Sequence, residues 1–73
     1  MNIVYAANEN FAKHLGVSLY SLYERNRYEK EIRVFIISMG IGEDSLGKLE
    51  NIAKKFSRKI EIIDFNNIKG RFD

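Results

Sequence analysis

A turn that follows the first apolar segment carries the residues best suited to chemistry. Ala6 and Ala7 are small, and Asn8, Glu9 and Asn10 follow them directly. Small side chains at the end of a strand let a ligand approach the backbone, and open α/β sheets bind ligands outside the carboxyl ends of their strands. Asn is also a strong helix N-cap, because its side-chain oxygen accepts from a free N–H group of the first turn. The turn therefore supports two interpretations, a ligand-binding lip and a structural cap.

Other kinds of site find little support in the residue types and spacings. Neither G-x-G-x-x-G nor G-x-x-x-x-G-K-[ST] occurs, so the sequence predicts no classical dinucleotide fold and no P-loop. His14 is the only histidine and has no cysteine partner for a metal site, and Ser18 and Ser21 lack a base at a plausible spacing. Glu9 and the Glu43–Asp44 pair stand isolated, so they predict no acid–base catalysis.

The length and composition are those of one small globular domain. A chain of 73 residues buries only ~60% of the surface that it exposes when unfolded, so we expect marginal stability. The hydrophobic fraction is 45%, and no apolar run approaches the ~20 residues that span a bilayer. The absence of cysteine removes disulfides and thiolate zinc sites, and it fits a cytoplasmic location.

Three apolar runs predict strands. Residues 3–6 form a short run that we expect to be buried on both faces, and residues 32–38 form the strongest strand signal, typical of a central strand. In residues 59–65 the polar residue Glu61 stands between apolar ones, and this alternation predicts a less buried third strand. With helices between them the order is β-α-β-α-β, and right-handed crossovers then give an α/β fold with a parallel sheet of strand order 3-2-1.

Two segments between these runs have helical periodicity. Residues 11–26 carry one apolar stripe and residues 43–56 carry another. Gly16 interrupts the first helix, and close packing against the strands would explain it. The stripes consist of Phe11, Leu15, Leu19 and Leu22 in the first helix, widened by Ala12, Gly16 and Tyr23, and of Leu46, Leu49, Ile52, Ala53 and Phe56 in the second.

Several segments together resemble glycosyltransferase family 8. The stretch Ile3-Val-Tyr-Ala-Ala-Asn-Glu-Asn-Phe-Ala12 is similar to the strand, turn and aromatic-Ala pair that open this family, and Leu15-Gly-Val-Ser-Leu-Tyr-Ser-Leu22 continues the match. The resemblance extends through Glu31-Ile-Arg-Val-Phe-Ile-Ile-Ser38 and Ile60-Glu-Ile-Ile-Asp-Phe65. Enzymes of the family are several times longer. The resemblance thus implies that residues 1–73 are a single truncated N-terminal nucleotide-sugar-binding portion, half of a Rossmann-like GT-A sheet.

The same resemblance implies transfer of a hexose from a UDP-sugar with retention of anomeric configuration. It implies a substrate-binding set of Ala6, Ala7, Asn8 and Asn10, in which Ala6 contributes backbone, Asn8 reads the uracil and Asn10 hydrogen-bonds nearby. The family commonly has Asp at the position of Asn8, but an Asn carbonyl can still accept from the uracil imide N–H. Family members hold Mn²⁺ with an Asp-x-Asp pair and a downstream His, and neither occurs here. We therefore expect weak UDP-sugar binding and no turnover by this chain alone.

Two alternatives remain open, a small nucleic-acid-binding module and an inactive remnant. Basic residues form two clusters, Arg25, Arg27, Lys30 and Arg33 at one end and Lys54, Lys55, Arg58 and Lys59 at the other. Glutamates dilute both clusters, and helix C-termini favour cations anyway, so a solvated surface is the preferred interpretation. We also expect self-association through the exposed edge of the Ile3–Ala6 strand, because bare edges recruit other strands.

Overall fold

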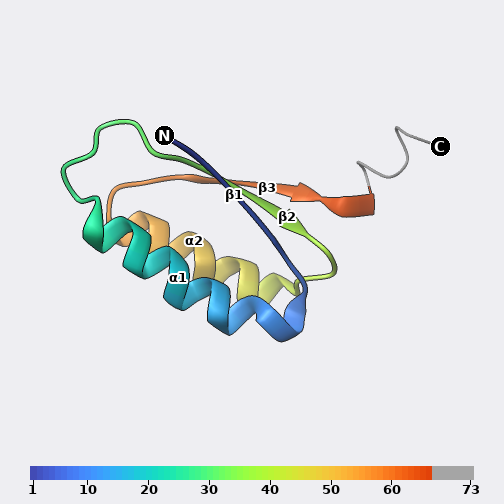
Figure 1. Ribbon diagram of the computed structural model, residues 1–73. Helices are drawn as coiled ribbons and strands as arrows, with labels where there is room; N and C mark the ends of the chain where they lie inside the picture. The colour runs from blue at the N-terminus through green and yellow to red at the C-terminus, as the bar shows by residue number, and fades with distance from the viewer. Residues whose placement is uncertain (67–73) are drawn as a thin grey trace.

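The computed structural model describes residues 1–66, which form a three-stranded sheet with two helices packed on it (Figure 1). The strands are β1 (Asn2–Ala7), β2 (Arg33–Ser38) and β3 (Ile60–Asp64). A short 3-10 helix, η1 (Glu9–Phe11), leads into α1 (Ala12–Arg25), and α2 (Glu43–Lys55) connects β2 to β3. The predicted β-α-β-α-β order is confirmed.

The strand β2 is central, as its apolar run predicted. Both β1 and β3 pair with it in parallel, which gives the order β1-β2-β3, the predicted 3-2-1 order seen from the other edge. In this register Tyr5 lies beside Ile36, and Ile36 beside Ile62. Because the three strands run in one direction, their carboxyl ends meet at a single edge of the sheet. The turn after β1 and the beginning of α2 lie at that same edge (Figure 1).

The core lies between the sheet and the two helices, which cover the same face (Figure 1). The largest fully buried side chains come from both helices and from the central strand: Leu19, Tyr23, Val34, Ile36 and Leu49. Along β2 the residues facing the helices alternate with half-buried ones on the opposite face. This alternation is the two-residue period of a strand with one well-covered face. None of the helices within residues 1–66 is long and apolar enough to cross a membrane.

The strand β1 is not buried on both faces, so this expectation was wrong. Val4 is 61% exposed, whereas Ile3 and Tyr5 are half-buried against the core. Val4 pairs with Phe35 on the sheet face that no described helix covers. A continuous apolar run is typical of a strand covered on both sides. In the described part of the chain the cover is present on one side only.

The buried stripe of α1 consists of residues that the sequence predicted, but Phe11 is not part of it. Phe11 is 60% exposed and only precedes the helix, and Leu22 is half-buried. The reason is η1, because three residues in 3-10 geometry place Phe11 out of phase with the 3.6-residue period that begins at Ala12. The residues that α1 buries are Ala12, Leu15, Leu19 and Tyr23.

The two helices also contact each other directly. A Cβ atom at Gly16 would lie 3.5 Å from Cδ1 of Ile52, so Gly16 packs against α2. The expectation that it packs against the strands was wrong. Farther along, the rings of Tyr20 and Phe56 meet edge to face with centroids 5.1 Å apart. The predicted stripe of α2 does face the core, with Leu49 buried most completely.

Candidate functional site

The turn after β1 lies at the carboxyl edge of the sheet, where the sequence placed it. Asn8 is exposed and has an extended backbone, and its Oδ1 accepts a hydrogen bond from the Phe11 N–H at 3.2 Å. Asn8 therefore does cap the short helix η1. The cap uses one of the two lone pairs on Oδ1 and neither of the amide hydrogens. The second lone pair of Oδ1 and both amide hydrogens of this exposed side chain remain free to bind a ligand.

The other three predicted site residues occupy different environments. Ala6 and Asn10 are exposed, so a ligand can reach the backbone at Ala6 and the amide of Asn10. Ala7 is only 5% exposed, and its carbonyl accepts from the Met39 N–H at 2.8 Å. Ala7 therefore joins the turn to β2, whereas Ala6, Asn8 and Asn10 are available for contact.

The turn after β2 forms a second wall beside the first. The Ser38 hydroxyl oxygen is buried in this turn and accepts from the Ile41 N–H at 3.1 Å. Gly40 has a φ of 85°, a left-handed conformation that glycine adopts without steric cost. With the bond between Met39 and Ala7, the two turns form one continuous rim at the carboxyl ends of β1 and β2.

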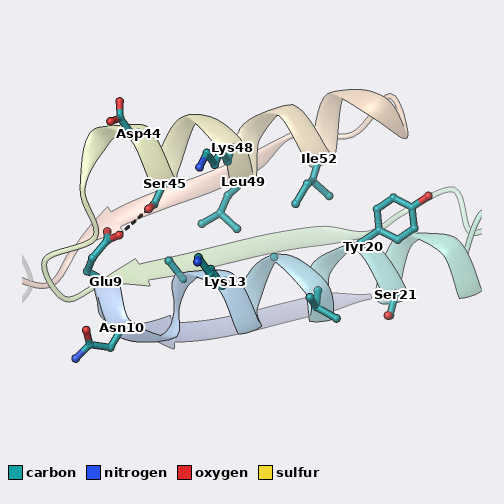
Figure 2. A pocket seen from close by; sticks show the side chains of 13 residues that line it. Glu9, Asn10, Lys13, Tyr20, Ser21, Asp44, Ser45, Lys48, Leu49 and Ile52 are labelled. Atoms are coloured by element: carbon teal, nitrogen blue, oxygen red, sulfur yellow. Dashed lines mark hydrogen bonds between the residues drawn. The ribbon is translucent and has the colours of Figure 1, made fainter.

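Glu9 is not isolated, contrary to the sequence interpretation. Its Oε1 accepts from the Gly42 N–H and its Oε2 accepts from the Ser45 hydroxyl, both at 2.8 Å; Figure 2 shows the bond to Ser45. The pKa of Glu9 is lowered below its ordinary value, mainly by the hydrogen bond from Gly42. The bond from Ser45 and the nearby charge of Lys48 lower the pKa further. These contacts join residues more than thirty positions apart, so no local pattern could reveal them. The one hint in the sequence is a helix start, Gly42, that lacks a capping side chain of its own.

A groove of about 870 Å³ lies between α1 and α2 (Figure 2). Its apolar lining includes Val17, Leu49 and Ile52, and Lys13 and Lys48 come from its two sides. The groove shares Glu9 and Asn10 with the turn, but Ala6, Ala7 and Asn8 do not line it. The predicted lip and the groove are therefore adjacent surfaces that meet at Glu9 and Asn10.

The two basic clusters lie at the same end of the molecule, not at opposite ends as the sequence suggested. The side chain of Arg58, after α2, donates to carbonyl oxygens in the loop after α1, those of Asn26, Glu29 and Lys30. Arg33 pairs with Glu61 at 3.4 Å, and Arg27 pairs with Glu24 at 3.7 Å. Both helices end at this edge because both run antiparallel to the strands. The basic residues are thus opposite the Asn8 turn and are partly engaged within the fold.

The residues near the rim do not fit the Mn²⁺ ion that the family resemblance implies. Both oxygens of Glu9 already accept hydrogen bonds at the start of α2. Asp64, at the end of β3, accepts from the Asn66 N–H at 2.8 Å, and apart from Glu9 the polar side chains of the turn are amides. Over residues 1–66, no group of three or more His, Asp or Glu side chains comes together to hold a metal ion. We therefore assign no step of a reaction to a metal held by this chain.

Known proteins match both the sequence and the fold. The family model for glycosyl transferase family 8 matches residues 2–72. General stress protein A of Bacillus subtilis is 36% identical over 88% of this chain. The galactosyltransferase LgtC, solved in complex with donor and acceptor sugar analogues, is 28% identical over 96% of this chain with a TM-score of 0.78. An active-site mutant of LgtC is 30% identical over 88% of this chain with a TM-score of 0.76.

The matches differ greatly from this chain in length. The chain spans 22% of general stress protein A, and 22% and 26% of the two LgtC chains. The matched part contains the parallel strands and helices described above, so the sheet is a partial, Rossmann-like half of the GT-A fold. On the family match over nearly all of its sequence, the chain belongs to glycosyltransferase family 8.

Proposed function

We propose that this chain supplies the uridine-binding part of a retaining hexosyltransferase that uses a UDP-sugar donor. The observation that carries the proposal is the exposed Asn8 amide, which follows the small residue Ala6 at the carboxyl edge of a parallel sheet. Ligands bind at this edge in open α/β sheets. The complex of LgtC with donor and acceptor sugar analogues supports the proposal, because LgtC shares this fold.

The hydrogen-bonding capacity of Asn8 suits a uracil edge. Its Oδ1 keeps one lone pair for the imide N–H of the base, and its Nδ2 can donate to a neighbouring uracil carbonyl. The exposed backbone at Ala6 and the adjacent Ser38–Gly40 turn would flank the nucleotide. A pocket normally buries most of a ligand, whereas one rim buries only part of it, so we expect weak binding. We also expect no turnover of UDP-hexose, since no residues of the chain form a metal-binding Asp-x-Asp pair.

A titration with UDP, followed by NMR of the backbone amides, tests the proposal. Chemical shifts should change from Ala6 to Phe11 and in the Ser38–Gly40 turn. Asn8→Ala should abolish these changes, because losing a hydrogen-bond partner of a desolvated group costs ~1–3 kcal/mol. Asn51→Ala removes an equally exposed amide from α2 and should leave binding unchanged.

Nucleic-acid binding is the second candidate, and the shared position of the two basic clusters favours it. Adding RNA or DNA would then shift residues near Arg25, Arg27, Lys54 and Lys55, and affinity would fall steeply with salt as counterions are released. These residues lie at the opposite edge from Asn8, so the two kinds of binding give separate NMR patterns. Salt-sensitive shifts at the basic edge, with the Asn8 turn untouched by UDP, would overturn the uridine-binding proposal.

We further propose that the outer edge of β1 recruits a second copy of the chain. Among the described strands, β1 pairs with β2 alone, and Val4 is exposed in its middle. An unpaired apolar edge is a template for another strand. A cytoplasmic location, expected from the sequence, remains a prediction.

A further inference from the structure

The start of α2 lacks a capping side chain from its own sequence. Its N-cap residue is Gly42, which makes no side-chain hydrogen bond there. The first turns of helices leave N–H groups unsatisfied, and a carboxylate beside them is favoured by the helix dipole. Glu9 supplies this carboxylate from a segment that precedes the helix by 33 residues. The cap of α2 is therefore provided by the turn that carries Asn8.

The contact between Glu9 and α2 is closely fitted. A Cβ atom at position 42 would lie 3.3 Å from Oε1 of Glu9, so the absence of a side chain at Gly42 gives the carboxylate its space. Ser45 lies one turn into the helix and donates its hydroxyl to the second oxygen. Figure 2 shows the Glu9 side chain reaching from the turn towards Ser45. Two bonds of one carboxylate to a helix end hold the carboxylate in position and in orientation.

Beyond the bond of the Ala7 carbonyl to Met39 at its beginning, the turn itself has few other restraints. The 3-10 helix η1 has only three residues, and such helices have poorer hydrogen-bond geometry than α-helices. Asn8 is exposed and is held by its own bonds to Phe11, which lie within the same turn. Glu9 is the next residue in the chain after Asn8. Its bonds to α2 therefore fix the backbone that aims the Asn8 amide.

We propose that Glu9 is a positioning residue, which holds the Asn8 turn in its ligand-binding geometry by anchoring it to the start of α2. The proposal rests on the proposed uridine-binding function of Asn8. Without the anchor the turn would sample other conformations, and the apparent affinity falls in proportion to the fraction that remains competent. We expect UDP binding to weaken about three- to tenfold in Glu9→Ala.

A double variant separates positioning from simple stabilisation of α2. Gly42→Asp places a capping carboxylate on the helix itself, and in the Glu9→Ala background the space beside position 42 is free. The double variant should therefore recover thermal stability but not UDP affinity. Glu50→Ala removes an exposed carboxylate elsewhere on α2 and should change neither quantity.

The measurements are NMR titrations with UDP, thermal unfolding, and amide relaxation of residues 8–11 in the free protein. Increased motion of these amides in Glu9→Ala, retained in the double variant, supports the proposal. Recovery of both stability and UDP affinity in the double variant would show that Glu9 acts only as a helix cap and would overturn it. Equal UDP affinity of wild type and Glu9→Ala would overturn positioning while leaving the Asn8 proposal intact. Failure of UDP to shift the wild-type turn would overturn both.

Discussion

The Met39 N–H donates to the carbonyl of Ala7 at 2.8 Å and ties the ends of β1 and β2 together. The last pair in the register of these strands is Ala7 and Ser38, so this bond extends the ladder one step beyond the sheet. The chain then leaves through Gly40, whose φ of 85° lies in the left-handed region. The rim beside Asn8 thus depends on one interstrand bond and on one glycine.

Replacing Gly40 by alanine should destabilise the protein through the backbone alone. No atom would lie within 4 Å of the added Cβ, so the methyl group meets no steric obstacle. The left-handed conformation of a non-glycine residue costs roughly 1 kcal/mol, and we expect the free energy of unfolding to fall by about that amount. Urea denaturation measures this change.

Gly47→Ala is the matched control for this experiment. Gly47 also has nothing within 4 Å of its added Cβ, but it lies inside α2. Alanine is favoured over glycine in a helix interior by about 1 kcal/mol, so this variant should be more stable than wild type. If the free energy of unfolding changed in the same direction in both variants, the loss of stability in Gly40→Ala could not be assigned to its left-handed backbone conformation.

A charge in the middle of β1 should reduce self-association. Val4 is 61% exposed on this edge strand, and charged side chains are a common means of blocking strand edges. Val4→Lys should therefore shift the molar mass at high concentration towards the monomer, as measured by light scattering. Val17→Lys is the control, because Val17 is 69% exposed on α1, away from the strand edge. A wild-type chain that stays monomeric at high concentration would exclude the proposed contact.

The fold could be predicted from the sequence because its elements depend on local patterns. The apolar run of β2 indicated a central strand, and Ile36 is indeed fully buried there. The order of elements then fixed the parallel topology. The exposure of Val4 could not be predicted in this way, because it depends on which faces of the sheet the helices cover. The burial expected for Phe11 was also wrong, because η1 changes the helical period just before Ala12.

The site was predictable only as far as its residues follow one another in sequence. Asn8 follows β1 directly, so its place at the carboxyl edge follows from strand direction. The role of Glu9 depends on Gly42 and Ser45, which reach it only through the packing of α2 beside α1. The same packing brings Arg58 to the loop after α1. Contacts between distant segments carry no signal in a single sequence.

Truncation of Leu19 and of Phe11 should have very different effects on stability. Leu19 of α1 is fully buried in the core, and removing a buried leucine side chain typically costs 2–5 kcal/mol, about the whole stability of a small domain. Phe11 is 60% exposed, so Phe11→Ala should change the free energy of unfolding by roughly 0.5 kcal/mol or less. Circular dichroism during urea titration compares the two. A large loss of stability in Phe11→Ala would show that Phe11 belongs to the buried stripe, as the sequence predicted, and would contradict its observed exposure.

The bonds of Glu9 to α2 should make stability depend on pH in the acid range. The Gly42 N–H, the Ser45 hydroxyl and the Lys48 charge lower the pKa of Glu9 in the folded protein. Because the ionised carboxylate is favoured by folding, its contribution is fully present above the unfolded pKa of about 4.3. The contribution is lost as the pH falls through the lower pKa of the folded state.

The measurable quantity is the difference in thermal midpoint between wild type and Glu9→Gln across pH. Glutamine keeps one acceptor but carries no charge, so wild type should be more stable at pH 7, and the difference should close as Glu9 is protonated. Lys13 of α1 and Asp44 of α2 also line this region, so a second carboxylate lies near the start of α2. The comparison is therefore repeated in an Asp44→Asn background, where the difference in thermal midpoint should still disappear at low pH. A difference that stays constant down to pH 2 would show that the charge of Glu9 does not stabilise the start of α2.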